Sequence, residues 1–188
     1  MNPADPMQAL AAPGLRLEPL LASHADELYA VLREPGMFRW IDQPPPASLQ
    51  ALRERYALLQ ARMPPDASQA WLNWALRPLD GEQACIGLVQ ATVLPEGSGS
   101  WAWVAYQLSA AWRGRGLARA ATAVMIEHLR QHWGCTRWLA TVEADNLASV
   151  RLLQALGFAA ATADEAAAHR LAASERLFVL RAMPQPQP

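Results

Sequence analysis

The chain has 188 residues, a formal net charge of −1 and 52% hydrophobic residues, a composition typical of one globular domain. The near-neutral charge argues against a general binder of nucleic acids, although all 16 basic residues are arginines. No apolar run reaches the length of a membrane span, and the N-terminus lacks the basic cluster of a secretory signal. We therefore expect a cytoplasmic protein with no membrane or nucleic-acid partner.

The chain begins with an expected tail and one strand. Residues 1–13 contain three prolines and residues 184–188 alternate proline with glutamine, so both ends are expected to be flexible. Leu15–Leu20 alternates like a half-buried strand. Ser23 is expected to cap a helix that runs to about Arg33, because acidic residues follow it in the first turn.

Two large aromatic residues, Phe38 and Trp40, precede three consecutive prolines. Ser48 then opens a second expected helix over about residues 49–63. Because large aromatic residues are usually buried for packing alone, Phe38 and Trp40 are expected either in the core or against a ligand.

Three strands are expected next. Residues 71–77 and 85–93 read as an antiparallel pair joined across an Asp-Gly turn. A Gly-Ser turn leads to residues 101–108, which are rich in aromatic and branched residues. Trp101 and Trp103 share one sheet face, so we expect them in the core rather than as a platform for nucleic-acid bases. The two cysteines have no metal-site spacing, so free thiols are expected, although one disulfide is also permitted.

A basic loop with two glycines, Arg113-Gly-Arg-Gly-Leu-Ala118, separates the third of these strands from a helix. Such glycines let backbone N–H groups point outward together at the positive end of the helix dipole, and arginine donors suit phosphate. A Walker loop needs a lysine, which this chain lacks, and the dinucleotide fingerprint needs glycine or alanine where Arg119 stands. The loop therefore predicts a pyrophosphate site of another kind.

The C-terminal part predicts a strand over 137–143, a helix opened by Asn146, and a last strand over 176–181. The alanine-rich segment 164–173 fits either a short helix or a loop. A meander followed by β-α-β units predicts an α/β fold. We expect one domain over residues 14–183, with a mixed, mostly antiparallel sheet of six to seven strands and about four flanking helices.

The pattern Arg113-x-x-Gly116-x-Ala118 resembles the acyl-CoA loop of the GNAT family of N-acetyltransferases. The pattern Asn146-x-x-Ser149, followed by a helix and Leu-Gly-Phe, is similar to the second half of that family's cofactor site, particularly in the branch of ribosomal-protein alanine N-acetyltransferases. This resemblance implies an enzyme that moves an acetyl group from acetyl-CoA to a primary amine by direct attack in a ternary complex. The acceptor would be a small-molecule amine or a peptide N-terminus, and the branch commonly carries a glutamate where Ala120 stands.

In the resemblance, two central strands separate after Tyr106 and the pantetheine arm inserts between them, while Phe38 and Trp40 belong to the wall around the acceptor amine. The implied cofactor-binding residues are Tyr106, Gln107, Leu108, Arg113, Gly114, Arg115, Gly116, Leu117, Ala118, Asn146 and Ser149. Ser149 would protonate or hydrogen-bond the sulfur, and Asn146 equally fits a helix N-cap. Glu143, at a strand end, is our first choice for the base that deprotonates the amine. Asp145, Glu165, His169 or water alone remain alternatives.

Other interpretations stay open at this point. The same fold without turnover would be a CoA-binding or regulatory module, and an RNA-associated protein would use the arginines. His128 and His132, one helical turn apart, permit a zinc interpretation, but no third ligand lies nearby in the sequence, so we expect no metal. Dimers are common in such folds, and no feature of the sequence decides whether this chain forms a homodimer.

Overall fold

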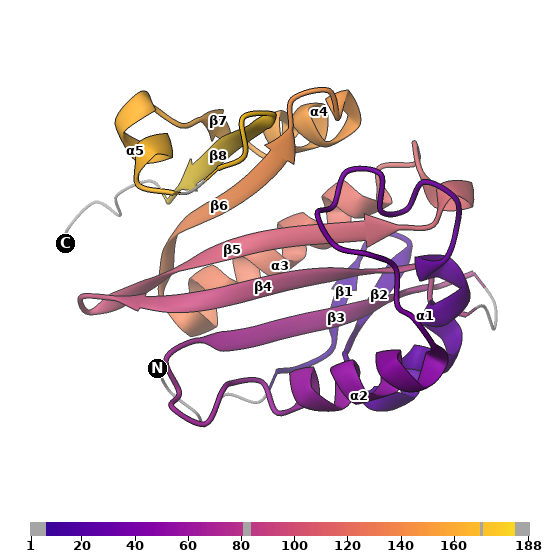
Figure 1. The fold of residues 1–188 in the computed structure, drawn as a ribbon. Coiled ribbons are helices and arrows are strands. Elements are labelled where there is room, and N and C mark those ends of the chain that lie inside the picture. The colour runs from indigo at the N-terminus through magenta and orange to yellow at the C-terminus, as the bar shows by residue number, and fades with distance from the viewer. Residues whose placement is uncertain (1–6, 81–83, 170, 183–188) are drawn as a thin grey trace.

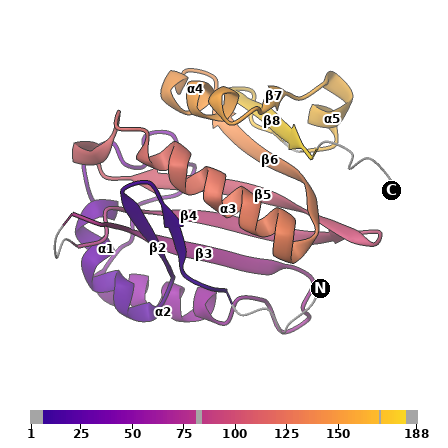
Figure 2. The same ribbon diagram turned by 180° about the vertical axis from the view of Figure 1, so that it is seen from behind.

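The computed structural model describes residues 7–80, 84–169 and 171–182. In this part of the chain, a mixed eight-stranded sheet has the order β1-β2-β3-β4-β5-β6-β8-β7 and helices on both faces (Figures 1 and 2). The elements are β1 (Leu10–Ala12), β2 (Leu15–Pro19), η1 (Ala22–His24), α1 (Ala25–Leu32), α2 (Leu49–Gln60), β3 (Ala70–Pro78), β4 (Gly87–Glu96), β5 (Gly99–Leu108), η2 (Ala110–Trp112), α3 (Leu117–Trp133), β6 (Cys135–Glu143), α4 (Leu147–Ala155), β7 (Ala159–Ala160), α5 (Ala163–Ala167) and β8 (Glu175–Arg181). The expected α/β class is confirmed.

Two short strands raise the number above the six to seven expected. β1 has three residues and β7 has two, which is too short for an alternating pattern to show in the sequence. The expectation of a flexible tail over 1–13 is therefore wrong for the residues of β1, which pair with β2, and Met7 is buried. The expected tails over 1–6 and 184–188 lie outside the described residues.

Of the two serine caps expected for the N-terminal helices, one is confirmed and one is wrong. Ser48 caps α2 as expected, since its Oγ accepts the N–H of Ala51 at 3.0 Å. Ser23 does not cap α1, because it lies inside the 3-10 turn η1, where His24 Nδ1 accepts the N–H of Leu21 at 2.9 Å. The open alternative over 164–173 is resolved in part by α5, a short helix with Thr162 as its capping residue.

The two faces of the sheet are covered by different helices (Figures 1 and 2). On one face α3 buries Ala121, Met125 and Leu129 in the largest core cluster, and α4 adds Leu153. On the other face α1 and α2 pack over β3 and β4. None of the helices in the described ranges combines the length and apolar character that a membrane span requires.

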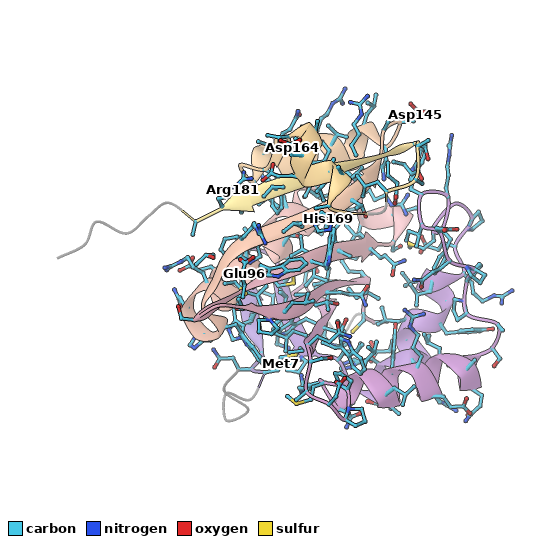
Figure 3. The ribbon with its side chains drawn as sticks, turned by 60° about the vertical axis from the view of Figure 1, so that its left-hand side comes forward. Met7, Glu96, Asp145, Asp164, His169 and Arg181 are labelled. Atoms are coloured by element: carbon cyan, nitrogen blue, oxygen red, sulfur yellow. The ribbon has the colours of Figure 1, made fainter. Side chains whose placement is uncertain are left out.

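A third, smaller core cluster lies on β6 and β8, where Trp101 and Trp103 pack against buried aliphatic side chains as expected. His169 covers this region, with its ring centre 5.1 Å from that of Trp103 (Figure 3). This cluster packs the paired part of β5 and β6 and does not include the residues after Trp103 on β5.

Candidate active site

The site begins where β5 and β6 separate. They pair in parallel only as far as Trp103 and Leu139. Beyond that point β5 follows β4 to Leu108, while β6 follows β8 to Glu143, so each strand stays with its outer neighbour and the two diverge (Figure 1). The separation expected after Tyr106 therefore starts earlier, after Trp103. The facing backbone groups of the separated stretches are those to which an extended ligand can add as a further strand.

The glycine loop lies at the open end of this separation and is introduced by the short turn η2. Gly114 and Gly116 have φ of +75° and +77°, a left-handed conformation that residues with a Cβ disfavour. Gly116 is the N-cap residue of α3 and has no side chain to bond the first amides of that helix. These N–H groups are therefore available to an anion, and the pyrophosphate site expected from the sequence stays a prediction.

Each of the two arginines of the loop is anchored to a backbone carbonyl in the segment just before the loop. Arg113 Nε donates to the carbonyl of Leu108 at 3.0 Å, and Arg115 Nη2 donates to the carbonyl of Ala111 at 3.0 Å. The Arg115 guanidinium also lies 4.8 Å from the ring centre of Trp112. Both side chains are exposed, so their remaining N–H groups can bond a phosphate.

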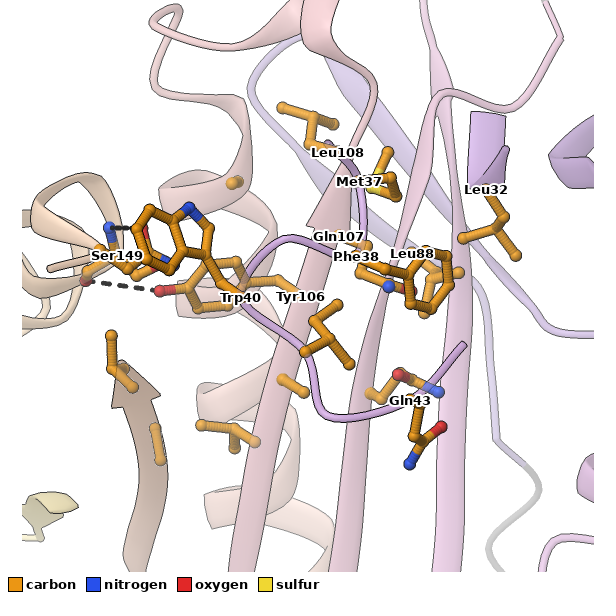
Figure 4. A pocket seen from close by; sticks show the side chains of 18 of the residues that line it. Leu32, Met37, Phe38, Trp40, Gln43, Leu88, Tyr106, Gln107, Leu108 and Ser149 are labelled. Carbon is orange, nitrogen blue, oxygen red and sulfur yellow. Dashed lines mark hydrogen bonds between the residues drawn. The ribbon is translucent and has the colours of Figure 1, made fainter. Parts of the chain in front are cut away.

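The start of α4 faces the same opening. Asn146 Oδ1 accepts the N–H of Ser149 at 3.3 Å, so the capping interpretation of Asn146 is confirmed. Its amide NH₂ remains a potential donor to a ligand. Tyr106, from β5, donates its hydroxyl hydrogen to the carbonyl of Ser149 at 3.4 Å and thereby links β5 to the start of α4 (Figure 4).

One cleft of about 1670 Å³ is lined by all the expected cofactor-binding residues, by Phe38 and Trp40 and by the first-choice base Glu143. Figure 4 shows part of this cleft. Its lining includes Phe38, Trp40, Tyr106, Gln107, Leu108, Arg113, Gly114, Arg115, Gly116, Leu117, Ala118, Glu143, Asn146 and Ser149. The cleft thus joins the glycine loop, the strand separation and the connection between α1 and α2.

The family model described as the acetyltransferase (GNAT) domain matches residues 14–159, which include the strand separation, the glycine loop and all of α4. The chain belongs to the GNAT acetyltransferase family. It is thus an acyltransferase of the N-acetyltransferase type. A search of the curated proteins finds no match to the sequence.

Solved GNAT structures share the fold at low sequence identity. The ribosomal-protein-S5-alanine acetyltransferase of Vibrio fischeri superposes with a TM-score of 0.76 at 17% identity, over 95% of this chain and 100% of that one. RimJ of Mycobacterium smegmatis, in complex with CoA-disulfide, gives 0.71 at 20% identity, over 95% and 88%. RimL, a ribosomal L7/L12 alpha-N-protein acetyltransferase in complex with coenzyme A, gives 0.73 at 15% identity, over 93% and 98%. These structures therefore share the GNAT fold with this chain.

Two carboxylates line the cleft of this GNAT protein at the end of β6. Glu143 stands directly opposite Glu175 of β8 in the antiparallel register, so both side chains point to the same sheet face. Sequence reasoning missed Glu175 because the expected last strand began at Arg176. The alternation of that strand, continued back by one residue, would have placed Glu175 beside Glu143.

The alternative bases have other surroundings. Glu165 accepts the Thr162 N–H at 3.0 Å as part of a capping box and forms an ion pair with Arg181. His169 packs against Trp103, and Asp145 is exposed. None of the three candidates Asp145, Glu165 and His169 is among the described residues that line the cleft.

The connection between α1 and α2 forms the opposite wall of the cleft. Phe38 and Trp40 are both half-buried there. Phe38 also packs against the core cluster beneath α1 and α2, which confirms its expected role in the core, while contact with a ligand stays a prediction. Trp40 is covered by the Arg39 guanidinium, whose central carbon lies 4.6 Å from the ring centre.

A polar floor between these walls was not expected from the sequence. Gln90 Nε2 donates to Asn73 Oδ1 at 2.8 Å across the β3–β4 pair, and both residues line the cleft. Tyr56 of α2 also belongs to the lining, and its buried hydroxyl has no partner in the described part of the chain. Burial raises the pKa of Tyr56, so this hydroxyl stays protonated. Strand alternation alone would have placed Asn73 and Gln90 on this face.

A cluster away from the cleft contains three potential metal-ligand side chains, Glu18, His24 and Cys85. Hydrogen bonds occupy the potential ligand atoms of His24 and Glu18. His24 Nδ1 accepts the Leu21 N–H, so Nε2 carries the proton that it shares with Glu18 at 3.1 Å. Arg77 bonds the same carboxylate, which places a positive charge where a cation would bind. We interpret this cluster as a structural ion-pair network.

The helical pair His128 and His132 is explained by packing. His128 is buried, and its ring centre lies 5.6 Å from that of Trp74 in an edge-on arrangement. His132 is exposed on the next turn. Among the described residues, the pair is not part of a group of three potential ligands.

Proposed function

We propose that the protein transfers the acetyl group of acetyl-CoA to a primary amine by direct attack of the amine in a ternary complex. The observation that carries this proposal is the separation of β5 and β6 beyond Trp103, with the glycine loop at its open end. Glu143 lies in the same cleft.

The residues fit coenzyme A along the length of the cleft. The amides at the start of α3, with Arg113 and Arg115, would hold the pyrophosphate. The free edge of β5 near Tyr106–Leu108 would bond the pantetheine arm, and one N–H there would polarise the thioester carbonyl. RimL and RimJ carry coenzyme A or its disulfide in their structures, which supports this assignment.

Direct attack is favoured because neither cysteine is placed to form an acyl-enzyme. Cys85 and Cys135 are both buried, and neither lines the cleft. Burial raises the pKa of Cys85 to about 12 and that of Cys135 to about 11, so the nucleophilic thiolate is scarce at neutral pH.

The amine must lose a proton before or during attack, and Glu143 would accept it, directly or through one water. Glu175 stands opposite and would add a second negative charge that attracts the ammonium form of the acceptor. Two like charges held opposite each other favour a cation between them. Glu143 would thus act as base and Glu175 as part of the recognition of the amine.

The thiolate that leaves needs a proton, and two hydroxyl groups stand at the start of α4. A phenol, with a reference pKa of about 10, is a stronger acid than a serine hydroxyl. Burial raises the pKa of Tyr106, so its hydroxyl is protonated throughout the neutral range. We assign proton donation to Tyr106, whose hydroxyl hydrogen would have to turn from the Ser149 carbonyl to the sulfur, and a hydrogen bond to the sulfur to Ser149.

The acceptor is a peptide N-terminus or a small-molecule amine, and the ribosomal-protein substrates named for the Vibrio and RimL proteins favour the peptide. The test is release of free thiol from acetyl-CoA with peptides, amino acids, polyamines and aminoglycosides, alongside calorimetry of CoA binding. Turnover with one class supports the proposal and names the substrate. CoA binding without any turnover would favour a CoA-binding module instead. No CoA binding would overturn the proposal.

A further inference from the structure

Glu34 connects two parts of the cleft that are distant in sequence. Its Oε1 accepts a hydrogen bond from Ser109 Oγ at 2.6 Å, and its Oε2 accepts one from the Ala110 N–H at 2.7 Å. Glu34 follows the end of α1, whereas Ser109 and Ala110 lie between β5 and the glycine loop. One carboxylate thus joins the start of the α1–α2 connection to the start of the loop.

The local geometry shows why these bonds are specific. Ser109 is buried and is the N-cap residue of η2, yet its side chain makes no capping bond within its own turn. Glu34 supplies the missing acceptor for the first amide of η2. Hydrogen bonds to a carboxylate are shorter and stronger than those between neutral groups. Glu34 therefore caps η2 from another element.

A second contact, three residues after Glu34, is made by Met37. Met37 is buried, and its sulfur lies 3.8 Å from Arg113 Nη2, at the other end of η2. Phe38 and Trp40 come directly after it and line the cleft (Figure 4). The start of the acceptor wall is thus attached to both ends of the turn that leads into the glycine loop.

We propose that Glu34 is a positioning residue that couples the glycine loop to the acceptor wall, so that coenzyme A orders residues 36–43 before the amine binds. This inference rests on the proposed function, because it takes coenzyme A as the ligand of the loop. A ligand that selects one arrangement of the loop also selects the arrangement of the wall attached to it. By reciprocity, the acceptor strengthens CoA binding by the same factor, typically about 5- to 150-fold in such couplings.

Hydrogen–deuterium exchange of the peptide over 36–43, with and without saturating CoA, tests the coupling without an acceptor. In the wild type, CoA is expected to slow exchange by about fivefold or more. Glu34→Gln is expected to bind CoA, by calorimetry, but to show less than about a twofold change in exchange. Glu127→Gln is the matched control, because Glu127 pairs with Arg130 on the exposed side of α3; it should behave as the wild type.

Each outcome has a distinct meaning. If the wild type does not bind CoA, the proposed function fails and the coupling fails with it. If CoA binds but exchange over 36–43 is unchanged, or slows equally in Glu34→Gln, only the coupling is overturned. Should thermal unfolding show that Glu34→Gln does not fold, Ser109→Ala replaces it; this variant removes one of the two donors to Glu34 and is expected to reduce the protection.

Discussion

At the scale of single residues, Glu143 should control the rate. Replacing Glu143 with glutamine keeps the size of the side chain and removes the proton acceptor. We expect kcat/KM for the amine to fall by about 100-fold or more, while the Kd for CoA changes little, because the glycine loop holds the pyrophosphate. Thiol release and calorimetry measure the two quantities. Glu175→Gln is the paired variant and should mainly raise KM; an equal loss of kcat in both would contradict separate roles.

The two hydroxyl groups at α4 make a second pair of variants. Tyr106→Phe removes the proposed proton donor and its bond to the Ser149 carbonyl. We expect kcat to fall by about 100-fold. Ser149→Ala should lower kcat by about tenfold or less, as expected for the loss of one hydrogen bond. Steady-state kinetics at saturating acetyl-CoA compares the kcat values of the two variants. A larger loss of kcat in Ser149→Ala than in Tyr106→Phe would indicate that Ser149 is the proton donor.

At the scale of elements, the features with a local cause were predicted from the sequence. The cap at Ser48 and the cap at Asn146 each follow from residue type and spacing within one turn. The strand pair β1–β2 is a local hairpin across Pro13-Gly14, but β1 is too short for an alternating pattern to show in the sequence. The contacts of Glu34, by contrast, depend on residues that only the tertiary fold brings together. No pattern within one segment contains that information.

Gly116 is the N-cap residue of α3, so its conformation affects both the stability of the helix start and the proposed binding of CoA there. A Cβ at Gly116 would meet nothing within 4 Å, so Gly116→Ala costs only the strain of a φ of +77°. We expect a loss of about 1–2 kcal/mol in the free energy of unfolding and about a tenfold weaker Kd for CoA, because the amides at the start of α3 shift. Gly97→Ala is the control, with a φ of +57° and equal space in the β4–β5 turn. It should lose stability alone; equal CoA affinity in both variants would contradict the anion site.

At the scale of the whole molecule, the cleft exists because the sheet consists of two parts joined by a short parallel ladder. β1 to β5 form one part and β6 to β8 the other, and α3 contacts β5 and β6 below the separation. The sequence predicted the order of the longer elements, and the family resemblance implied that two strands separate. The expected point, after Tyr106, was too late in β5, because that point depends on how far each strand follows its outer neighbour.

The first part of the sheet is held to α1 by a charged network around Arg77. Arg77 Nε and Nη2 donate to the Glu18 carboxylate at 2.9 and 3.1 Å, and Nη1 donates to Glu27 at 2.9 Å. The hydrogen bond from Arg77 is the main reason that the pKa of Glu18 is lowered to about 2. The Glu18 side chain is only 16% exposed, so water screens this pair weakly.

This network makes stability depend on pH in a defined direction. Because the pKa of Glu18 is lowered on folding, its ionised form stabilises the protein above the usual value of 4.5, and this contribution is lost as the pH falls toward about 2. We expect Glu18→Gln to lower the free energy of unfolding by about 2 kcal/mol at pH 7. The difference from the wild type should shrink between pH 5 and pH 2, as measured by urea unfolding at several pH values.

Glu127 provides the comparison that decides whether burial matters in this effect. The Arg130 guanidinium also lowers the pKa of Glu127 to about 2, but the Glu127 side chain is 50% exposed. Solvent screening and side-chain entropy offset such a pair, so Glu127→Gln should change stability by less than about 0.5 kcal/mol. Equal effects of the two substitutions at pH 7, or a Glu18→Gln difference that does not shrink in acid, would show that the Arg77 network does not stabilise the fold as its geometry implies.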